Sequence, residues 1–586
     1  MSTLDWVVLV GWLTFIVLYG LWRGRGSRDL DGYLLAGHKL KWGNVALAIM
    51  ATQASAVTVL ATPGQAYADG MRFVQFYFGL PIAMVVLAAT AVPIYRRLRV
   101  FTAYEYLETR FDLKTRSLTS LLFLTQRGLA AGITIYAPSL ILSVLLGWNT
   151  QLTILLIGSL VILYTATGGT RAVNYTQFLQ FLIMIGGIVT AGLLAIAAMP
   201  HGVSLPDALH VAGALDRLRA VDTSFDLESR YNIWSGLIGG CFLALSYFGC
   251  DQSQVGRYLG GQSVAQSRMG LLFNGLAKVP MQFVILLVGA LVFAFYQFTP
   301  PPAFFNPVEV RKLEQGPRSE EFRALRHQHE IVAATRAARA RDYVAARMAV
   351  PEVREQARLE LEKADLAVST VRARTTALMK EQDPKAQTVD TNYVFLSFVL
   401  AQFPAGMVGL LLAAVFAASM SASSAELNAL ASTTVVDLWG RLVRGRAPGT
   451  EPLATQGPEA ARAAREDVMV SRIATVLWGV FAIGFAMLAG QLGSLVEAVN
   501  ILGSLFYGTI LGIFLTGFYF KRVGGSAVFF AALVAEVAVL ACFKLTKISF
   551  LWYNVVGCVL VVVLGLAISA AMSRPRPAPA LAGTAR

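Results

Sequence analysis

Apolar residues recur along the chain in long runs that polar loops separate. A helix needs about 20 largely apolar residues to cross the hydrocarbon core of a bilayer. The pattern predicts about 13 transmembrane helices, at residues 5–22, 43–66, 74–94, 118–147, 151–167, 175–199, 232–250, 270–297, 403–430, 469–489, 498–519, 525–543 and 549–572. We therefore expect an all-α polytopic membrane protein.

Residues 299–392 depart from this pattern, because they are charged and rich in alanine. Two stretches within them, 319–349 and 352–380, consist mostly of strong helix formers. Pro351 separates the two stretches, and proline suits the first turn of a helix. The segment is predicted to form an extracytoplasmic helical hairpin with arms of roughly 45 Å. Two roles stay open for it: a solvated insertion without function, and a contact with another extracytoplasmic protein.

Two of the predicted spans are rich in small and polar residues. Residues 51–70 read ATQASAVTVLATPGQAYADG, and residues 232–250 are rich in glycine and end in the polar CDQSQ. Such spans free backbone carbonyls, which a membrane tolerates only beside protein or a water-filled cavity. The second of these spans comes five spans after the first in chain order. Because five is an odd number, the two helices cross the membrane in opposite directions. Paired broken helices of this kind indicate an inverted-repeat transporter with its site at the midplane. The alternative is two glycine-rich helices that pack closely.

The polar residues at these breaks and on their neighbours are the candidate solute contacts. They are Gln53, Ser55, Thr58, Gln75, Tyr77, Tyr136, Ser246 and Tyr247. A third span holds clustered serines, of which Ser421 and Ser424 share one helix face. Hydroxyls beside freed carbonyls form an oxygen site suited to sodium. Small residues that permit close helix packing are the alternative.

Three ionisable residues fall at similar depth within spans: Arg127, Lys278 and Glu426. Ionisable groups inside a membrane indicate function by default. They are predicted to form a buried charge network. One interpretation is a structural ion pair of Glu426 with one of the cations. The other is that surplus positive charge attracts an anionic solute.

Composition and charge exclude a soluble protein that binds nucleic acid. Of 586 residues, 56% are hydrophobic and 14% charged, whereas soluble proteins have about 25% charged residues. The net charge is +14, and basic residues such as Arg96 and Arg97 gather in short loops. Such loops favour the cytoplasmic side and anionic headgroups. We expect a multi-pass protein of the cytoplasmic (inner or plasma) membrane, with its N-terminus outside and its C-terminus inside.

The motifs of the chain resemble the sodium/solute symporter family. They are ASAVTVLATPGQAYADG, YEYLETRF, GITIYAPSLIL, GGTRAVNYTQFLQ and DQSQVGRYL, with SASSAELNALASTTVVDLW and GSLFYGTILGIFLTGFYFKR in agreement. SAVxxLxxPxxAY and GIxIYAPxLxL look most like the branch that carries iodide, monocarboxylates and vitamins. The resemblance implies a LeuT-type core of five plus five inverted helices and sodium-coupled symport of a small polar or anionic organic solute by alternating access.

The resemblance also implies an ion site and shows two departures from the family. The implied sodium ligands are Ala51, Ala54, Ala418, Ser421 and Ala422. The family usually has Ser or Thr where this chain has Ala422, and Asp where it has Gln177. In the family, a second sodium ion uses that carboxylate and hydroxyl groups at the positions of Ser424 and Ala425. Here the carboxylate and one of the two hydroxyls are missing, so we expect only one sodium ion. Proton-coupled or uncoupled transport by the same fold stays open.

The predicted organisation follows from these assignments. It comprises 1–42, a first transmembrane helix and cytoplasmic loop; 43–199, the first repeat; 200–231, an outer loop; 232–298, the start of the second repeat; 299–392, the insertion; 393–522, the rest of the second repeat; and 523–586, two C-terminal transmembrane helices and a short cytoplasmic tail.

Other classes of protein fit the sequence less well. The five histidines all fall in the segments between the predicted spans, and no metal-ligand spacing or nucleophile motif is present. We therefore expect no enzyme and no cofactor, with sodium as the coupling ion and the solute, the ion and the bilayer as partners. A transporter-like solute sensor is the remaining alternative, and the short tail after the last span argues against it.

Overall fold

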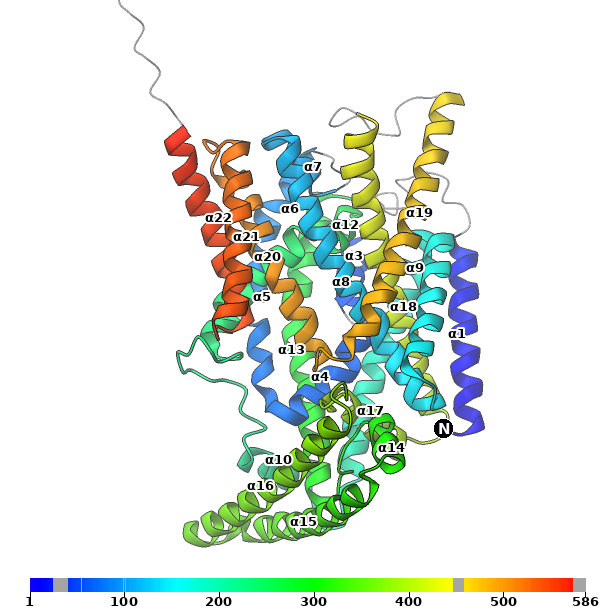
Figure 1. The fold of residues 1–586 in the computed structure, drawn as a ribbon, viewed down its shortest axis with the longest axis vertical. Helices are drawn as coiled ribbons and strands as arrows, with labels where there is room; N and C mark the ends of the chain where they lie inside the picture. Colours follow the sequence, from blue (N-terminus) through cyan, green and yellow to red (C-terminus); the bar gives the residue numbers. More distant parts are fainter. Residues whose placement is uncertain (25–39, 54, 99, 101, 446–457, 573–586) are drawn as a thin grey trace, which may run out of the picture.

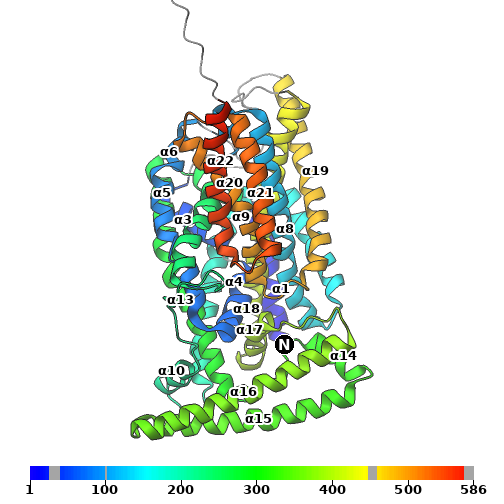
Figure 2. The same cartoon turned by 60° about the vertical axis from the view of Figure 1, so that its left-hand side comes forward.

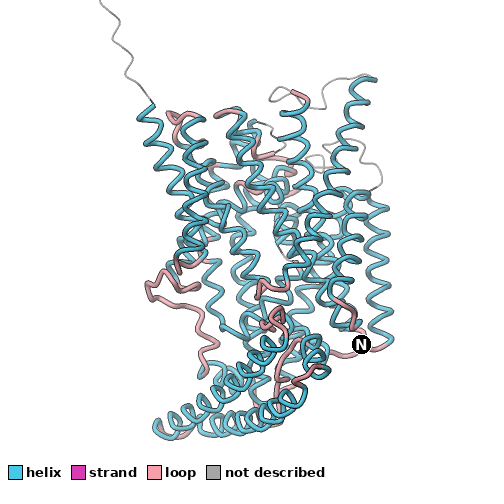
Figure 3. Tube along the Cα trace, viewed as in Figure 1, coloured by secondary structure: helices cyan, strands magenta, loops and turns pink. Residues whose placement is uncertain are grey.

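The computed structural model describes residues 1–24, 40–53, 55–98, 100, 102–445 and 458–572. Throughout this part of the chain the backbone forms helices and loops without a β-strand (Figure 3). Leu40 and Gly261 form an isolated parallel bridge, which joins two loops. The predicted all-α fold is confirmed.

Nine helices of the described residues are long and apolar enough to cross a membrane. They are Ala56–Leu98, Leu113–Leu146, Gln180–Ala197, Val264–Phe298, Met407–Val443, Glu466–Ala489, Leu495–Tyr519, Gly525–Leu545 and Phe550–Met572. Three shorter apolar helices, Thr3–Phe15, Thr150–Ala166 and Ser235–Gly249, coincide with further predicted spans. The chain is therefore a polytopic membrane protein, as predicted.

The helices form an upright bundle with a separate layer across one end (Figure 1). In chain order the elements used below are α1 (Thr3–Gly24), α3 (Trp42–Gln53), α4 (Ala56–Asp69), η2 (Gly70–Tyr77), α5 (Leu80–Ala89), α8 (Leu113–Leu146), α9 (Thr150–Ala197), α10 (Leu205–Ala214), η3 (Ser235–Gly239), α11 (Gly240–Gly249), α12 (Gln252–Leu259), α13 (Val264–Phe298), α14 (Pro307–Gln315), α15 (Ser319–Ala345), α16 (Pro351–Gln382), α17 (Thr391–Gln402), α18 (Met407–Thr433), η5 (Thr434–Val443), α19 (Pro458–Ala489), α20 (Leu495–Tyr519), α21 (Gly525–Leu545) and α22 (Phe550–Met572).

One element differs from the prediction. The spans expected at 151–167 and 175–199 are joined in a single helical element, α9, of 48 residues. The residues that link the two apolar parts contain glycine but no proline. Glycine weakens a helix by only about 1 kcal/mol, whereas proline removes a hydrogen bond and clashes with the preceding turn. The composition of the link therefore permits a continuous helix.

Both predicted broken helices are discontinuous. The first ends at Gln53 as α3 and resumes at Ala56 as α4. The second runs from η3 through α11 to Gly249, and after Cys250 and Asp251 the chain begins α12. The second break thus lies at the polar CDQSQ motif that ends the predicted span. Each break leaves backbone groups without their usual helical partners in the middle of the bundle.

Close backbone contacts explain why these helices also contain small residues. A Cβ atom on Gly64 of α4 would lie 1.9 Å from the carbonyl oxygen of Thr391, at the start of α17. A Cβ atom on Gly236 of η3 would lie 2.1 Å from the carbonyl oxygen of Gln75. Neither position can accept a side chain without movement of the backbone. Both sequence interpretations therefore hold, because the helices are broken and also closely packed.

The insertion forms the predicted hairpin. Its arms, α15 and α16, have 27 and 32 residues and lie side by side across the end of the bundle (Figure 2). Pro351 is the first residue of α16, as expected. Arg336 of α15 donates to the carbonyl oxygen of Tyr296 in α13 at 2.8 Å and to Asp365 of α16 at 2.9 Å. The hairpin is thus held on the end of α13.

Candidate functional site

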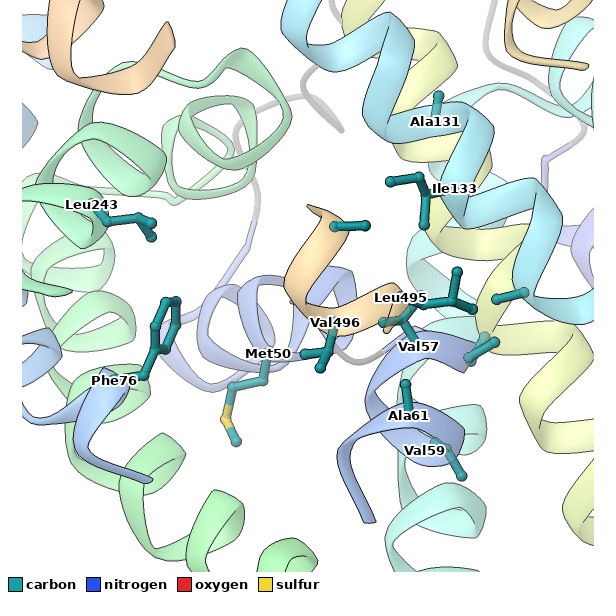
Figure 4. Close-up of a cluster of buried hydrophobic side chains, with 14 of the residues drawn as sticks. Met50, Val57, Val59, Ala61, Phe76, Ala131, Ile133, Leu243, Leu495 and Val496 are labelled. Carbon is teal, nitrogen blue, oxygen red and sulfur yellow. The ribbon is translucent and has the colours of Figure 1, made fainter. Parts of the chain in front are cut away.

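A cavity of about 140 Å³ lies where the two discontinuous helices face each other. Its lining comes from α3, α4, η2, α5, α8, α11, α13, α18 and α20. Apolar side chains form part of the wall, and Figure 4 shows Phe76 and Leu243 together on one side, with Val57 and Val496 on the other. The remaining lining is polar or charged, which is unusual for the middle of a membrane protein.

The first break supplies polar groups to this cavity. Gln53, Ser55 and Thr58 all line it, as predicted for solute contacts. The Thr58 hydroxyl donates to the carbonyl oxygen of Gln53 at 3.1 Å, which satisfies one group that the break frees. Gln53 Oε1 is buried without a hydrogen-bond partner among the described residues. An unsatisfied buried acceptor of this kind is available to a ligand.

Two tyrosines from different elements contribute to the cavity wall. Tyr77 of η2 and Tyr247 of α11 both line it. The Nζ atom of Lys278 lies 5.7 Å from the centre of the Tyr77 ring, and the guanidinium carbon of Arg127 lies 5.5 Å from that of Tyr247. Gln254 of α12 donates to the Tyr247 hydroxyl at 2.7 Å. Each of these two cations of the cavity wall therefore lies against a tyrosine ring.

Arg127 of α8 is the centre of a buried polar network. Its Nη1 donates to Glu426 of α18 at 3.1 Å, and its Nη2 pairs with Asp251 at the second break. Tyr507 of α20 lies 2.7 Å from both Arg127 Nη2 and Asp251 Oδ2. The other Asp251 oxygen accepts from the amide and hydroxyl groups of Ser253 and so caps α12. The predicted pairing of Glu426 with a cation is present, and Arg127 is that cation.

Lys278 does not join this network. Its side chain is 2% exposed and lines the cavity, yet it forms no ion pair with any described residue. Arg127 is already compensated by its two carboxylates. Of the cations among the described lining residues, Lys278 alone therefore lacks a nearby carboxylate. Counted together, Arg127, Lys278, Asp251 and Glu426 are formally neutral, so the predicted surplus of positive charge is only a local one, at Lys278.

Three predicted solute contacts lie outside the cavity. Gln75 is buried and bonds backbone groups of Arg72, Tyr231 and Asp222. The Ser246 hydroxyl donates to the carbonyl oxygen of Tyr507 at 2.7 Å. Tyr136 is directed to Gln387, with its hydroxyl 3.4 Å from Oε1. These side chains are engaged by protein groups, so the geometry does not support them as solute contacts.

Of the predicted sodium ligands, Ala51 lies on α3, and Ala418, Ser421 and Ala422 lie on the neighbouring α18. Ala51, Ala418, Ser421 and Ala422 are buried, and Ala422 also lines the cavity. Ala54 lies outside the described residues, and Gln177 falls in a part of α9 whose side chains are not described. Ser423 and Ser424 have buried hydroxyls without partners among the described residues. Ser419, by contrast, donates to the carbonyl oxygen of Thr134 at 2.9 Å.

The structure adds polar residues that the sequence interpretation did not single out. Asp251 and Tyr507 complete the network of Arg127, and Gln126 and Asn500 line the cavity. Asp251 belongs to the quoted DQSQVGRYL motif, so its position directly after a glycine-rich span was an available signal. Tyr507 also belongs to a quoted motif, GSLFYGTILGIFLTGFYFKR, and Asn500 belongs to none. The direction of both side chains depends on how α20 is rotated, which the sequence does not give.

The fold and this site define a class: a membrane transporter built on two discontinuous helices of opposite direction. The sequence model of the sodium:solute symporter family matches residues 33–315 and 374–535. The chain therefore belongs to the sodium:solute symporter family. The unmatched residues 316–373 fall within the hairpin. Membership makes the chain a transporter, not an enzyme, with sodium as the coupling ion.

Individual relatives agree with this family. The chain is 25% identical over 526 residues to the sodium-dependent multivitamin transporter of Oryctolagus cuniculus, an alignment of 89% of this chain and 67% of that protein. It is 32% identical over 282 residues to the human sodium/iodide cotransporter, 47% of this chain and 43% of that one. The match to the sodium/sialic acid symporter SiaT of Proteus mirabilis (strain HI4320) is 23% identical and covers 96% and 94%.

A solved structure shows the same fold. A sodium-coupled sialic acid symporter, in a substrate-bound outward-open state, superposes with a TM-score of 0.72 at 21% identity and covers 98% of both chains. This likeness establishes the LeuT-type architecture that the family resemblance implied.

Proposed function

We propose that this chain performs sodium-coupled symport of a small polar or anionic organic solute by alternating access. The observation that supports this most strongly is the cavity between the two helix breaks, whose lining combines polar groups with Lys278, a buried amine without a carboxylate partner among the described residues. A buried cation without a counter-charge is costly, and a bound anion would supply that charge. Gln53, Ser55, Thr58, Tyr77 and Tyr247 would then contact the rest of the solute.

A single sodium ion would bind between α3 and α18. The proposed ligands are the carbonyl oxygens of Ala51, Ala54 and Ala418 and the hydroxyl of Ser421. Ala422 occupies the fifth position of this site. Ala422 itself supplies no side-chain oxygen, which favours weak binding. The alternative within the same fold is proton-coupled or uncoupled transport, and the same missing oxygen supports it.

The proposed setting is the cytoplasmic membrane, with the N-terminus and the hairpin outside. The hairpin and the start of α1 lie at the same end of the bundle, and α22 ends at the opposite one (Figure 1). The basic loops of the sequence support placing the end of α22 inside. On the outside, the hairpin would be accessible to another extracytoplasmic protein.

We also propose the domain organisation of the inverted repeat. Residues 43–199 form one repeat, and 232–298 with 393–522 form the other. The first helix, 1–42, the loop 200–231, the insertion 299–392 and the C-terminal pair 523–586 lie outside the repeats. The two discontinuous helices at corresponding places support this division.

Uptake into proteoliposomes tests the function. A panel of labelled monocarboxylates, vitamins, inorganic anions and neutral sugars is offered with and without an inward sodium gradient at fixed pH. We expect accumulation of an anion that depends on the gradient. Lys278→Gln should raise the Km for that anion at least several-fold. Full uptake without sodium, together with dependence on a proton gradient, would overturn the assignment of sodium as the coupling ion. A preference for neutral solutes that Lys278→Gln does not change would overturn the assignment of an anionic solute.

A further inference from the structure

Glu497, in the first turn of α20, accepts hydrogen bonds from three side chains. Arg230 Nη1 lies 2.9 Å from Oε1 and 2.8 Å from Oε2 of this carboxylate. The Tyr231 hydroxyl donates to Oε1 at 3.1 Å, and Gln65 Nε2 donates to it at 3.3 Å. We call this group of four residues the Glu497 contact.

One donor lies on the first discontinuous helix, and the other two lie in the loop that leads into the second. Gln65 lies on α4, the second half of the first discontinuous helix, and Arg230 and Tyr231 directly precede the second one. Ser494, beside α20, also donates to Gln65 Oε1 at 2.8 Å. The Glu497 contact therefore joins both discontinuous helices to a third element that belongs to neither.

The contact lies next to the cavity, on the side of the hairpin. Val496, Val499 and Asn500, which flank Glu497 on α20, line the cavity. Figure 4 shows Leu495 and Val496 of α20 beside Val57 of α4. Gln65 is two turns beyond Thr58 along α4, toward the end of the bundle that the hairpin covers (Figure 1). The Glu497 contact therefore lies between the cavity and the end of the bundle that the hairpin covers.

We propose that the Glu497 contact is the gate that closes the cavity on the hairpin side and that Glu497 is its central residue. This inference rests on the proposed transport function. Opening would separate Glu497 from Arg230, Tyr231 and Gln65, so that α4 and the second discontinuous helix move away from α20.

The exposure of the residues agrees with a contact that opens and closes. The Arg230 side chain is 58% exposed, and that of Glu497 is 12% exposed. Water reaches the guanidinium group of Arg230 and competes with the carboxylate for it, which weakens the pair. Tyr507 lies ten residues further along α20 than Glu497, hence roughly 15 Å away, and forms a buried contact with Asp251 of the second break. Separation at Glu497 is therefore easier than separation at Tyr507, which would act as the fixed end of α20.

Cysteine accessibility tests the gate without any transport measurement. Val499→Cys places a thiol in the cavity of a chain in which Cys241, Cys250, Cys542 and Cys558 are replaced by alanine. A membrane-impermeant thiol reagent is applied from the hairpin side, in the absence of solute. We expect Glu497→Gln and Arg230→Gln to raise the labelling rate about three- to tenfold. Tyr231→Phe removes one hydrogen bond and should act in the same direction with a smaller effect.

Two further variants decide between a gate and a general loss of structure. The charge exchange Arg230→Glu with Glu497→Arg should return the rate toward that of the parent. Arg219→Gln is the matched control, because Arg219 pairs with Asp222 at 3.4 Å in the same loop without contacting α20. Unchanged labelling in the well-folded single variants, or an exchange no better than either of them, would overturn the gate. A failed solute panel would leave this labelling result standing, so the two proposals fail separately.

Discussion

Arg127 and Asp251 form an ion pair that joins α8 to the break in the second discontinuous helix. The two residues are 124 positions apart in the chain, and both are almost completely buried. Glu426 is a second carboxylate on the same guanidinium group. The break in the membrane-spanning helix is thus held by a charged group of a neighbouring continuous helix.

Arg127→Gln is expected to destabilise the protein more than Glu426→Gln. The first substitution leaves two buried carboxylates without their cation, and stranding a buried charge costs about 3–5 kcal/mol. The second leaves Arg127 paired with Asp251. The double variant should recover part of the loss of Arg127→Gln. Thermal unfolding in detergent measures this coupling, and strictly additive losses would show that Arg127 and Glu426 act independently.

Gln53→Ala is expected to weaken solute binding without affecting folding. Its Oε1 atom is buried at the cavity without a described partner, so a ligand is its natural donor. Loss of one hydrogen bond should lower affinity about tenfold, or roughly 1.4 kcal/mol. Gln75→Ala is the matched control, because Gln75 bonds backbone groups away from the cavity and should change stability only. Equal solute affinity in Gln53→Ala and the parent would refute the assignment.

Ala422→Ser is expected to raise sodium affinity with the Hill coefficient still near one. The added hydroxyl would replace part of the hydration shell of the ion. Ala425→Ser serves as a comparison, since it restores a hydroxyl of the second ion position but not the carboxylate that Gln177 lacks. Uptake at varied sodium and fixed pH measures both variants. A Hill coefficient near two in Ala425→Ser would show that a second sodium does bind.

Acidification is expected to loosen the hairpin through His329. Burial, with Arg372 and Arg336 nearby, lowers the pKa of His329 from 6.5 to about 4. The folded hairpin therefore favours the neutral ring, so its contribution to stability is complete above pH 6.5 and is lost as pH falls toward 4. Hydrogen exchange of residues 319–382 at pH 7, 5.5 and 4.5 measures this loss. His329→Gln should reduce the pH dependence, and an identical profile in that variant would contradict the role of His329.

Local sequence chemistry was sufficient to predict the breaks and the hairpin. Glycine, proline and hydroxyl residues within apolar runs indicate where a helix cannot continue, and Pro351 between two alanine-rich stretches indicates where a new one begins. The positions of Arg127 and Glu426 within their spans also predicted that the two residues lie at similar depth in the membrane, and the structure shows them paired. These predictions needed only residue type and distance along the chain.

The direction of each side chain could not be predicted in this way. Gln75, Tyr136 and Ser246 lie on elements near the cavity, yet their side chains are directed to protein groups elsewhere. Lys278 lies at the expected depth but faces Tyr77 instead of Glu426. Asp251 and Tyr507 meet Arg127 only after three distant segments pack together. Rotation and packing of helices, which the span pattern does not determine, decide all of these contacts.

Because the hairpin is attached to α13, movement of α13 in the transport core would also move the hairpin. A Cβ atom on Gly270 of α13 would lie 2.5 Å from Val45 of α3, and one on Gly289 would lie 2.3 Å from the carbonyl oxygen of Pro63 of α4. The helix that carries the hairpin is therefore in tight contact with both halves of the first discontinuous helix. Met348, at the turn between the arms, is 93% exposed. A fluorophore at this position would sense displacement of α13 from outside the membrane, and a binding protein that held the hairpin still would resist the same displacement.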